Sequence, residues 1–262
     1  MEVDRKLNYK FQEKDDRDYK IKMEKNGLIL KTSKGESIKL VKALVSNFII
    51  TGLAPILDQG NLGSCVANAA ALIISTQSKK VTNLSRILLY AICRISDNTN
   101  LNQDDGTTVR TCCEVLRKYG ACQENICPYN INLFSTLPSI NSLKNLNLFK
   151  NFMYYSVNQD INSLKHTLAI FNKPIIFGIM VYSSFMSSLV ASTGMVPMPN
   201  TTKETLLGGH CITMIGYDDK KLCFICANSW STNWGNKGLF YLPYNYVINP
   251  NLAGDFSYFT FG

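Results

Sequence analysis

Cys65 stands where a glycine-containing turn gives way to a run of helix-forming residues. The stretch from Asp58 to Ala71 reads Asp-Gln-Gly-Asn-Leu-Gly-Ser-Cys-Val-Ala-Asn-Ala-Ala-Ala. At a helix N-terminus, unpaired backbone N–H groups and the positive end of the helix dipole stabilise a thiolate and lower the pKa of the thiol. Cys65 is therefore a candidate nucleophile, and Gln59, six residues before it, offers a side-chain amide as a hydrogen-bond donor.

The chain has two histidines, in different settings. His166 lies within a helix expected over residues 160–171 with no acidic neighbour at hand, and we interpret it as a surface or boundary residue. His210 follows Gly208-Gly209, which permit close backbone approach, and opens a strand expected over residues 211–217. His210 is therefore the candidate acid and base.

Asn228 supplies a third polar group, because it ends another predicted strand just before Ser229-Trp230. Taken singly, His210 or Asn228 would be interpreted as structural. A thiol hydrolase, however, combines one cysteine with a His and an Asn, the two lying roughly 130 to 150 residues downstream. His210 follows Cys65 by 145 positions, so the three residues together predict a thiol hydrolase.

Three sequence blocks resemble the signatures of the papain family of cysteine peptidases, in the same order along the chain. They are Gln59-Gly-Asn-Leu-Gly-Ser-Cys65, Gly209-His210 and Asn228-Ser-Trp-Ser-Thr-Asn-Trp-Gly-Asn-Lys-Gly238. The similarity runs from about residue 53 to the end. Further stretches resemble a compact branch of the family found in bacteria and large viruses: Asp105-Gly106, Cys127-Pro128-Tyr129 and the tail from Leu242-Pro-Tyr-Asn-Tyr246 to Asp255-Phe256.

This resemblance implies a cysteine endopeptidase that acts on proteins or peptides, forms an acyl-enzyme intermediate and needs no cofactor or metal. Cys65 would attack the scissile carbonyl as a thiolate, and His210 would stabilise the thiolate and then protonate the leaving amine. Asn228 would orient the imidazole. The side-chain N–H of Gln59 and the backbone N–H of Cys65 would form the oxyanion hole. Trp230 would shield the bond between His210 and Asn228 from water.

The resemblance also assigns substrate contacts, mostly to glycines. Gly106 would pair through its backbone with an extended peptide. Gly178 and Gly208 would line the principal specificity pocket and leave room for a sizeable apolar side chain, with the pocket floor expected near residues 256–259. The full set of expected substrate-binding residues is Gly106, Gly178, Gly208, Gly209 and Trp230.

The chain departs from the family pattern at a few positions. Leu62 replaces a cysteine that forms a disulfide in secreted members, Val66 replaces an aromatic residue, and Ser231 replaces a glycine. The first 45 residues are expected to be β-rich, whereas the pro-segment common in the family is helical. Whether residues 1–45 are inhibitory therefore stays open.

The expected fold class is α+β, with a helical lobe, a β-rich lobe and the active site in the cleft between them. The peptidase domain is expected over residues 46–262, with its helical lobe at about 60–135 and its β-rich lobe at about 150–262. Helices are expected near residues 65–80, 85–95, 107–119 and 160–171, and strands near 175–181, 211–217, 221–227 and 238–242.

Residues 1–45 form an N-terminal extension, interpreted as a candidate pro-segment or cap. Its first 18 residues are strongly charged and are expected to be mobile or peripheral. Alternating apolar residues and two turns then predict a β meander, with strands at Tyr19–Met23, Leu28–Lys31 and Ser37–Val41.

Composition narrows the class of protein. The chain has 262 residues, is 46% hydrophobic and carries a net charge of +8, which is spread along the sequence without a basic run interleaved with aromatic residues, so no nucleic-acid partner is expected. The longest apolar runs fall short of the roughly 18 residues that span a membrane. No signal peptide is apparent, so a reducing environment, cytoplasmic or virion-associated, is expected.

Nine cysteines are too few for a disulfide scaffold in a chain of this length. Three close pairs, Cys112 with Cys113, Cys122 with Cys127 and Cys223 with Cys226, are interpreted as small buried hydrophobic residues rather than zinc ligands.

Three alternatives stay open. An exopeptidase would need an insertion that blocks the cleft, and Ser183 to Leu207 is long enough to contain one. A catalytically silent binding module of the same fold could have its cleft filled by the N-terminal meander. A thiol-redox or zinc protein is the third. The oligomeric state, the natural substrate and its cleavage preference do not follow from the sequence.

Overall fold

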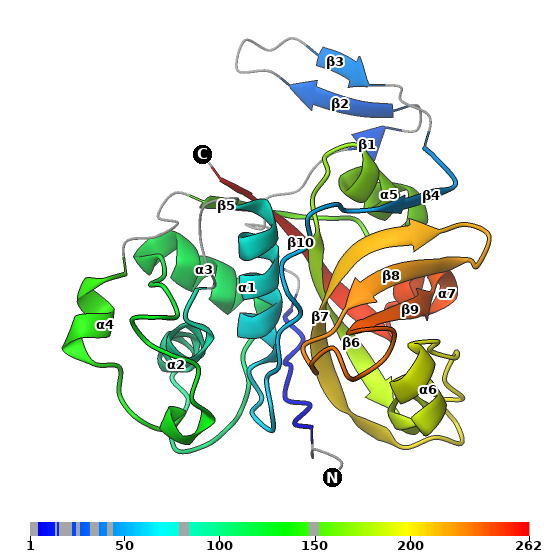
Figure 1. Ribbon diagram of the computed structural model, residues 1–262. Coiled ribbons are helices and arrows are strands. Elements are labelled where there is room, and N and C mark those ends of the chain that lie inside the picture. Colours follow the sequence, from blue (N-terminus) through cyan, green and yellow to red (C-terminus); the bar gives the residue numbers. More distant parts are fainter. Residues whose placement is uncertain are drawn as a thin grey trace.

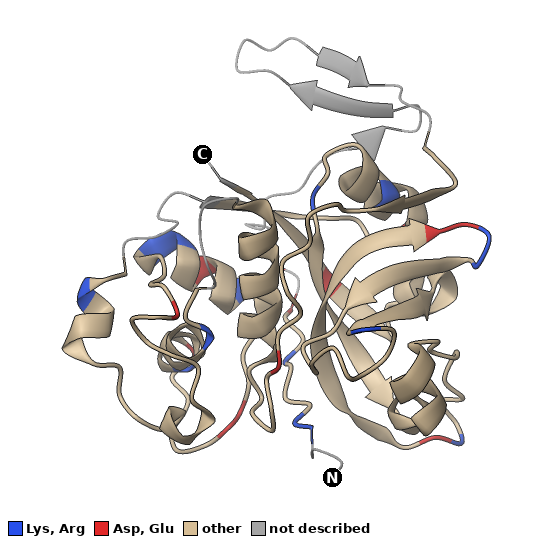
Figure 2. Ribbon diagram, in the orientation of Figure 1, with Lys and Arg blue, Asp and Glu red and all other residues tan. Residues whose placement is uncertain are grey.

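The computed structural model describes residues 5–13, 15, 23–24, 27–31, 37–40, 44–78, 84–146 and 152–261. They form a helical lobe and a sheet lobe side by side, with the chain near the N-terminus running between them (Figure 1). The α+β fold with two lobes is therefore confirmed. Lys, Arg, Asp and Glu are scattered over both lobes (Figure 2). Within the described part of the chain, no helix has the length and apolar character needed to cross a membrane.

The helical lobe contains the three helices predicted for it. Ser85 and Thr108 cap the second and third helices by accepting hydrogen bonds from the backbone N–H groups of Leu88 and Thr111, and Gly120, at φ 77°, follows the third. A 3₁₀ helix, η1, and a short helix, α4, were not predicted. The elements are α1 Cys65–Gln77, α2 Arg86–Ser96, α3 Val109–Tyr119, η1 Ile131–Leu133 and α4 Ile140–Lys144.

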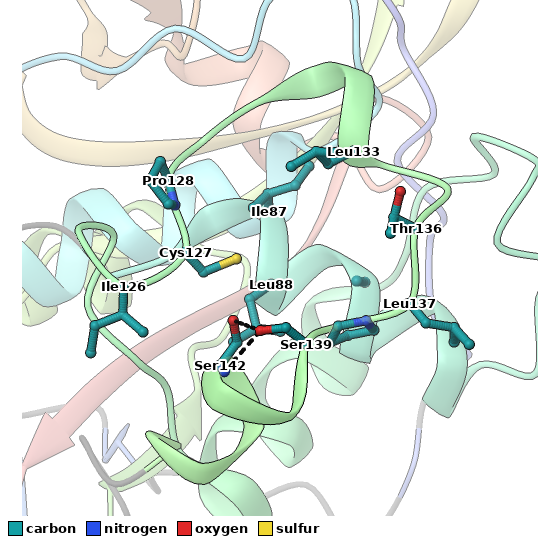
Figure 3. Close-up of a pocket in the computed structure, with 12 residues that line it drawn as sticks. Ile87, Leu88, Ile126, Cys127, Pro128, Leu133, Thr136, Leu137, Ser139 and Ser142 are labelled. Carbon is teal, nitrogen blue, oxygen red and sulfur yellow. Dashed lines mark hydrogen bonds between the residues drawn. The ribbon is translucent and has the colours of Figure 1, made fainter.

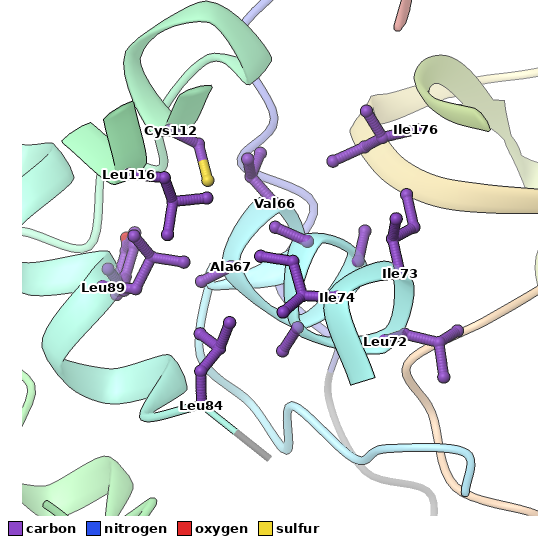
Figure 4. Close-up of a cluster of buried hydrophobic side chains, with 14 of the residues drawn as sticks. Val66, Ala67, Leu72, Ile73, Ile74, Leu84, Leu89, Cys112, Leu116 and Ile176 are labelled. Atoms are coloured by element: carbon purple, nitrogen blue, oxygen red, sulfur yellow. The ribbon is translucent and has the colours of Figure 1, made fainter. Parts of the chain in front are cut away.

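Helix α1 is the centre of this lobe, because its first ten residues, from Cys65 to Ile74, are all buried. Small residues such as Ala67 and Ala70 let neighbouring elements approach, and larger side chains including Leu89 and Leu116 pack around them (Figure 4). On its other side α1 packs against strand β7 of the sheet lobe. The position of Cys65 at the start of α1 is therefore fixed by close packing.

The sheet lobe is built on a seven-stranded antiparallel sheet with the order β5-β10-β6-β7-β8-β9, in which β4 also pairs with β7. The four predicted strands are confirmed as β6, β7, β8 and β9, while β4, β5 and β10 were missed. The bounds are β4 Asn47–Ile49, β5 Phe152–Ser156, β6 Ile175–Tyr182, β7 Leu206–Asp218, β8 Cys223–Ala227, β9 Leu239–Pro243 and β10 Ala253–Phe261.

Helical segments cover parts of this sheet. The predicted helix after Asp160 is α5 Ile161–Ala169, capped by the Asp160 carboxylate, which accepts a hydrogen bond from the backbone N–H of Ser163. The 3₁₀ helix η2 Ser183–Met186, α6 Ser188–Thr193 and α7 Tyr244–Ile248 were not predicted. The stretch that could have held an exopeptidase insertion contains η2 and α6, and it is bound to strand β9 by the parallel bridge between Met195 and Tyr241.

The N-terminal meander is confirmed in part. Strands β1 Met23–Glu24, β2 Gly27–Lys31 and β3 Ser37–Leu40 form a three-stranded antiparallel sheet. The predicted strand positions at residues 19–22 and 41 lie outside the described residues.

The prediction for the first 18 residues was wrong where the structure describes them. Residues 5–13, which we call the N-terminal segment, lie between the lobes, and Tyr9 is only 5% exposed. Leu7, Tyr9 and Phe11 alternate with polar or charged residues, which is the spacing of an extended segment with one apolar face. Residues 1–4, 14 and 16–18 lie outside the described residues.

Candidate active site

Cys65 is the first residue of α1 and is fully buried. Burial raises the pKa of its thiol to about 12, although the backbone N–H groups of Cys211, Val66 and Cys65 itself favour the thiolate. The expectation of a lowered pKa at this helix start is therefore wrong for the structure as it stands, because the loss of water outweighs the helix terminus. The thiol is neutral while the N-terminal segment covers it.

His210 and Asn228 meet in the sheet lobe, one on β7 and the other directly after β8. Nε2 of His210 lies 2.8 Å from Oδ1 of Asn228. The same oxygen accepts the backbone N–H of Ser229 at 2.8 Å, so the imidazole Nε2 must be the donor. This leaves Nδ1 as the basic nitrogen, and it has no hydrogen-bond partner among the described residues.

The surroundings of His210 keep it neutral. Burial lowers the pKa of the imidazole to about 4; the hydrogen bond to Asn228 opposes this shift, and the positive charge of Arg5 adds to it. The ring of Trp230 is stacked on the imidazole, with 4.8 Å between ring centroids and 28° between planes. Trp230 thus lies where it shields His210 from water. Cys211, the residue after His210, contacts the Cys65 thiol through its backbone N–H, which brings the two half-sites together.

Gln59 connects the two lobes. Its side-chain Nε2 donates to the carbonyl of Leu62 at 2.9 Å and to the carbonyl of Lys6 in the N-terminal segment at 3.4 Å. Its Oε1 accepts the hydroxyl of Ser229 at 2.6 Å, and its backbone N–H donates to the Ser229 carbonyl at 2.8 Å. Sequence reasoning missed Ser229 as an orienting residue, although it stands between Asn228 and Trp230 in the third signature block.

Tyr129 and Arg86 support the loop that carries Gln59. The Tyr129 hydroxyl donates to the carbonyl of Gln59 at 2.9 Å and lies 2.6 Å from the hydroxyl of Ser64. The Arg86 guanidinium lies 3.9 Å from the centroid of the Tyr129 ring and donates to the carbonyl of Asp58 at 3.1 Å. Arg86 therefore holds the start of the turn before Cys65, at Asp58, and Tyr129 holds both Gln59 and the end of the turn, at Ser64.

Two acidic residues complete this support. Glu124 forms a bidentate pair with Arg86, at 2.8 Å to Nε and 2.7 Å to Nη2. The Asp104 carboxylate accepts the backbone N–H of Gly63 at 2.8 Å and the hydroxyl of Tyr90 at 2.5 Å. No local sequence pattern marked either carboxylate, because each acts on a segment distant along the chain.

Comparison with known proteins decides the family. The family model described as papain family cysteine protease matches residues 49–258. The chain belongs to the papain family of cysteine proteases. An uncharacterised peptidase C1-like protein of Acanthamoeba polyphaga mimivirus is 34% identical over 213 residues, which cover 76% of this chain and 68% of that protein.

Solved structures of papain-family proteins agree in fold. The crystal structure of xylellain, a cysteine protease from Xylella fastidiosa, superposes with a TM-score of 0.85 at 30% identity and covers 100% of this chain and 99% of that one. A digestive procathepsin L of Tenebrio molitor larvae shares the fold at 21% identity, with a TM-score of 0.62, covering 92% of this chain and 75% of that one. The predicted papain-like fold and thiol peptidase class are confirmed.

The glycines to which the resemblance to the papain family assigned substrate contacts all face the N-terminal segment. A Cβ atom at Gly106 would lie 1.6 Å from the carbonyl oxygen of Asn8, and one at Gly178 would lie 1.9 Å from Cε1 of Tyr9. Because a side chain at either position would clash, the segment depends on these glycines to reach the cleft floor.

Gly208 and Gly209 border the segment on the sheet side. Cβ atoms there would lie 2.4 Å from the carbonyl oxygens of Leu7 and Tyr9, respectively. The backbone N–H of Tyr9 donates to the Gly209 carbonyl at 3.0 Å. The segment is thus bound in an extended form by main-chain contacts, as a β-augmenting peptide would be.

Arg5 fixes the segment at its other end. Its guanidinium pairs with the Asp58 carboxylate at 2.6 Å, donates to the Gly60 carbonyl at 3.1 Å and lies 5.8 Å from the centroid of the Trp230 ring. Trp230, the last expected substrate-binding residue, therefore also faces the segment.

The pocket floor predicted at residues 256–259 is placed differently by the structure. Phe256 and Phe259 are buried in the core, and Phe256 stacks on Phe177 with 4.8 Å between centroids. Asp255 instead accepts the hydroxyl of Tyr9, because a β-bulge in β10 changes which side chains face the cleft.

Neither a metal site nor the cavity of the helical lobe is part of this chemistry in the described residues. All nine cysteines lie in the described residues and eight of them are buried, and no group of three or more His, Cys, Asp or Glu in the described ranges could hold a metal ion. An apolar cavity of about 260 Å³ lies in the helical lobe beside α2 and α4, lined in part by Leu88, Cys127 and Leu133 (Figure 3). It shares no lining residue with the cleft.

Proposed function

We propose that the chain is a cysteine endopeptidase that uses Cys65, His210, Asn228 and Gln59, and that its N-terminal segment keeps the site inactive until it is displaced. One observation carries this proposal. An extended peptide lies in the cleft with the carbonyl oxygen of Lys6 3.4 Å from Nε2 of Gln59. The cleft therefore accepts a peptide backbone and offers an amide donor to one of its carbonyls.

In the proposed reaction, Nδ1 of His210 takes the thiol proton and Sγ of Cys65 attacks the substrate carbonyl. The negative charge that develops on the carbonyl oxygen is stabilised by the Gln59 side chain and the Cys65 backbone N–H. The imidazolium then protonates the leaving amine, and the acyl group stays on sulfur. Water activated by the neutral imidazole hydrolyses the thioester and restores the thiol. Asn228 keeps Nε2 engaged, so that Nδ1 faces the reacting atoms.

The N-terminal segment would inhibit in two ways: it would occupy the cleft, and it would disfavour the charged forms of Cys65 and His210. Burial raises the pKa of Cys65 and lowers the pKa of His210, the charge of Arg5 in the segment lowers the pKa of His210 further, and the segment would add to the burial by excluding the water that a thiolate and an imidazolium require. Displacement of the segment would reverse both shifts and permit the ion pair. Residues 1–45 are a candidate pro-segment or cap, and within them residues 5–13 are the part that would inhibit, because their backbone reaches Gln59.

Action within a chain, rather than at its ends, is supported by the reach of the segment. It continues from Arg5, beside Trp230, past Gln59 to Gln12, which donates to Asp255 at 3.0 Å. Peptide thus extends to both sides of the catalytic residues. An exopeptidase needs one of these directions closed.

Hydrolysis of fluorogenic peptides in a reducing buffer tests the proposal. Tyr9→Ala in the full chain should expose the site and raise activity, while Lys10→Ala should not, because the Lys10 side chain is exposed. Cys65→Ala added to Tyr9→Ala should abolish the activity. If a broad peptide panel is untouched by the Tyr9→Ala protein while Cys65 reacts with thiol reagents, the chain is a silent binding module instead.

A further inference from the structure

The Tyr9 ring fills a pocket beside Gly178, and the residue paired with Gly178 on the neighbouring strand is a second glycine, which faces Phe11. Gly178 of β6 pairs directly with Gly254 of β10. A Cβ atom at Gly178 would lie 1.9 Å from the Tyr9 ring, and one at Gly254 would lie 3.2 Å from the ring of Phe11. The absence of a side chain at Gly178 therefore creates the space for the Tyr9 ring, and the absence of one at Gly254 leaves room for Phe11 beside it.

The far end of this pocket is polar. The pairing of β10 with β6 shifts register between Gly254 and Ser257, and Asp255 within this bulge has φ 61°. Bulges next to active sites re-aim side chains, and Asp is one of the few residues that tolerates the left-handed region. The Asp255 carboxylate accepts the hydroxyl of Tyr9 and the backbone N–H of Gln12.

We propose that Asp255 makes this pocket selective for substrate side chains that end in a hydrogen-bond donor, namely tyrosine, lysine or arginine. The inference rests on the proposed function, in which a substrate residue replaces Tyr9.

An ionised carboxylate can only accept hydrogen bonds, so the Tyr9 phenol must be the donor. Burial, and next the charge of Asp255, raise the pKa of Tyr9 well above its usual range, which keeps the phenol protonated. A phenylalanine or leucine in the pocket would remove water from the carboxylate without replacing this bond, and that loss is the source of selectivity.

Peptide profiling with the full chain carrying Tyr9→Ala tests the selectivity. Each position on either side of the scissile bond is varied among Tyr, Lys, Phe and Leu. At one position, kcat/KM for Tyr and Lys should exceed that for Phe by at least about tenfold. Adding Asp255→Gly, which suits the positive φ, should remove this preference, in part by raising the Phe rate, because no carboxylate is then left to lose its water. Asp255→Asn keeps an acceptor and should lose the Lys preference first.

Equal rates for Tyr, Lys and Phe at every position, or a preference that survives Asp255→Gly, would overturn the inference. If no peptide is cleaved, the proposed function fails. The role of Asp255 can still be tested by a measurement that does not depend on catalysis. Tyr9→Phe in the full chain should speed amide hydrogen exchange of the N-terminal segment by about tenfold, and Asp255→Gly should speed it further, because it also removes the acceptor of the Gln12 N–H. Exchange at the wild-type rate in Tyr9→Phe would refute the role of Asp255.

Discussion

On the helical side of the cleft, the loop that carries Gln59 is held by hydrogen bonds and a largely buried ion pair, whereas on the sheet side His210 is held by stacking on Trp230. Tyr129 binds the Gln59 carbonyl and stacks under Arg86. Trp230 stacks on His210 and meets Trp234 edge-on at 5.0 Å. Directional bonds suit a loop that must aim an amide donor, and ring packing suits an imidazole that must stay dry and in plane.

Truncation of Trp230, on the sheet side of the cleft, should have the largest effect on stability and activity. Trp230→Ala removes a fully buried ring and should lower the free energy of unfolding by about 3 to 5 kcal/mol, with loss of peptidase activity. Denaturant unfolding followed by circular dichroism measures this loss. Trp230→Phe keeps a ring against His210 and should recover much of the stability. A stable Trp230→Ala protein would show that packing does not hold this half-site.

The second largest effect is expected from acid, because His210 on the sheet side and Cys65 on the helical side respond differently to a fall in pH. The pKa of His210 is about 4 under the segment, against about 6.5 for a hydrated histidine, so protons bind more tightly once the segment is displaced. Docking is therefore complete above about pH 6.5 and weakens as pH falls toward 4, by a factor of order 10². While the segment is docked, the Cys65 thiol, with a pKa of about 12, stays neutral throughout this range. Peptidase activity after brief acid exposure should rise as the pH of that exposure is lowered. Activity that does not depend on this pH would contradict the claim that protonation of His210 releases the N-terminal segment.

Breaking the ion pair on the helical side should cost less than the loss of Trp230. Glu124→Gln leaves the Arg86 guanidinium, whose side chain is 9% exposed, without its counter-charge, and should destabilise the fold by about 1.5 to 3 kcal/mol. The exposed pair of Arg117 with Glu114 provides a comparison, because Arg117→Gln should cost less than about 1 kcal/mol. Thermal unfolding of both variants side by side measures the difference. Equal costs would mean that burial adds nothing to the Arg86 pair.

Tyr129→Phe should have the smallest effect on stability and a selective effect on rate. It removes only the hydroxyl that binds the Gln59 carbonyl, at about 1 kcal/mol of stability. In a Tyr9→Ala background, kcat should fall about tenfold with KM nearly unchanged, because the oxyanion donor loosens while the binding cleft is intact. A rise in KM alone would assign Tyr129 to substrate binding.

The sequence located the residues that carry chemistry better than it located what surrounds them. Cys65, His210 and Asn228 stand in blocks that can be recognised locally, and the helix starts predicted near residues 85 and 107 lie within two residues of the observed starts, Arg86 and Val109. Each is a short-range pattern. The support that Tyr129 gives to Gln59 joins positions 70 residues apart, and no periodicity encodes such a contact.

The cleft covering was missed for a related reason. Alternation of Leu7, Tyr9 and Phe11 predicts an extended segment but does not say what it covers. The Tyr9 hydroxyl meets Asp255, 246 positions away, and the bulge that turns Asp255 toward the cleft depends on the register between β10 and β6. Strand β10 itself went unpredicted, so neither the bulge nor its consequence could be anticipated.

Alkylation of Cys65 in the full chain is the most direct test of the central claim that the N-terminal segment covers an intact nucleophile. The rate is followed by peptide mass spectrometry at mildly acidic pH with a stoichiometric reagent, which resolves Cys65 from the eight other cysteines. Cys65 should react slowly in the native protein and in Lys10→Ala, and selectively faster than the other eight in Tyr9→Ala. Equal Cys65 rates in all three proteins would contradict it.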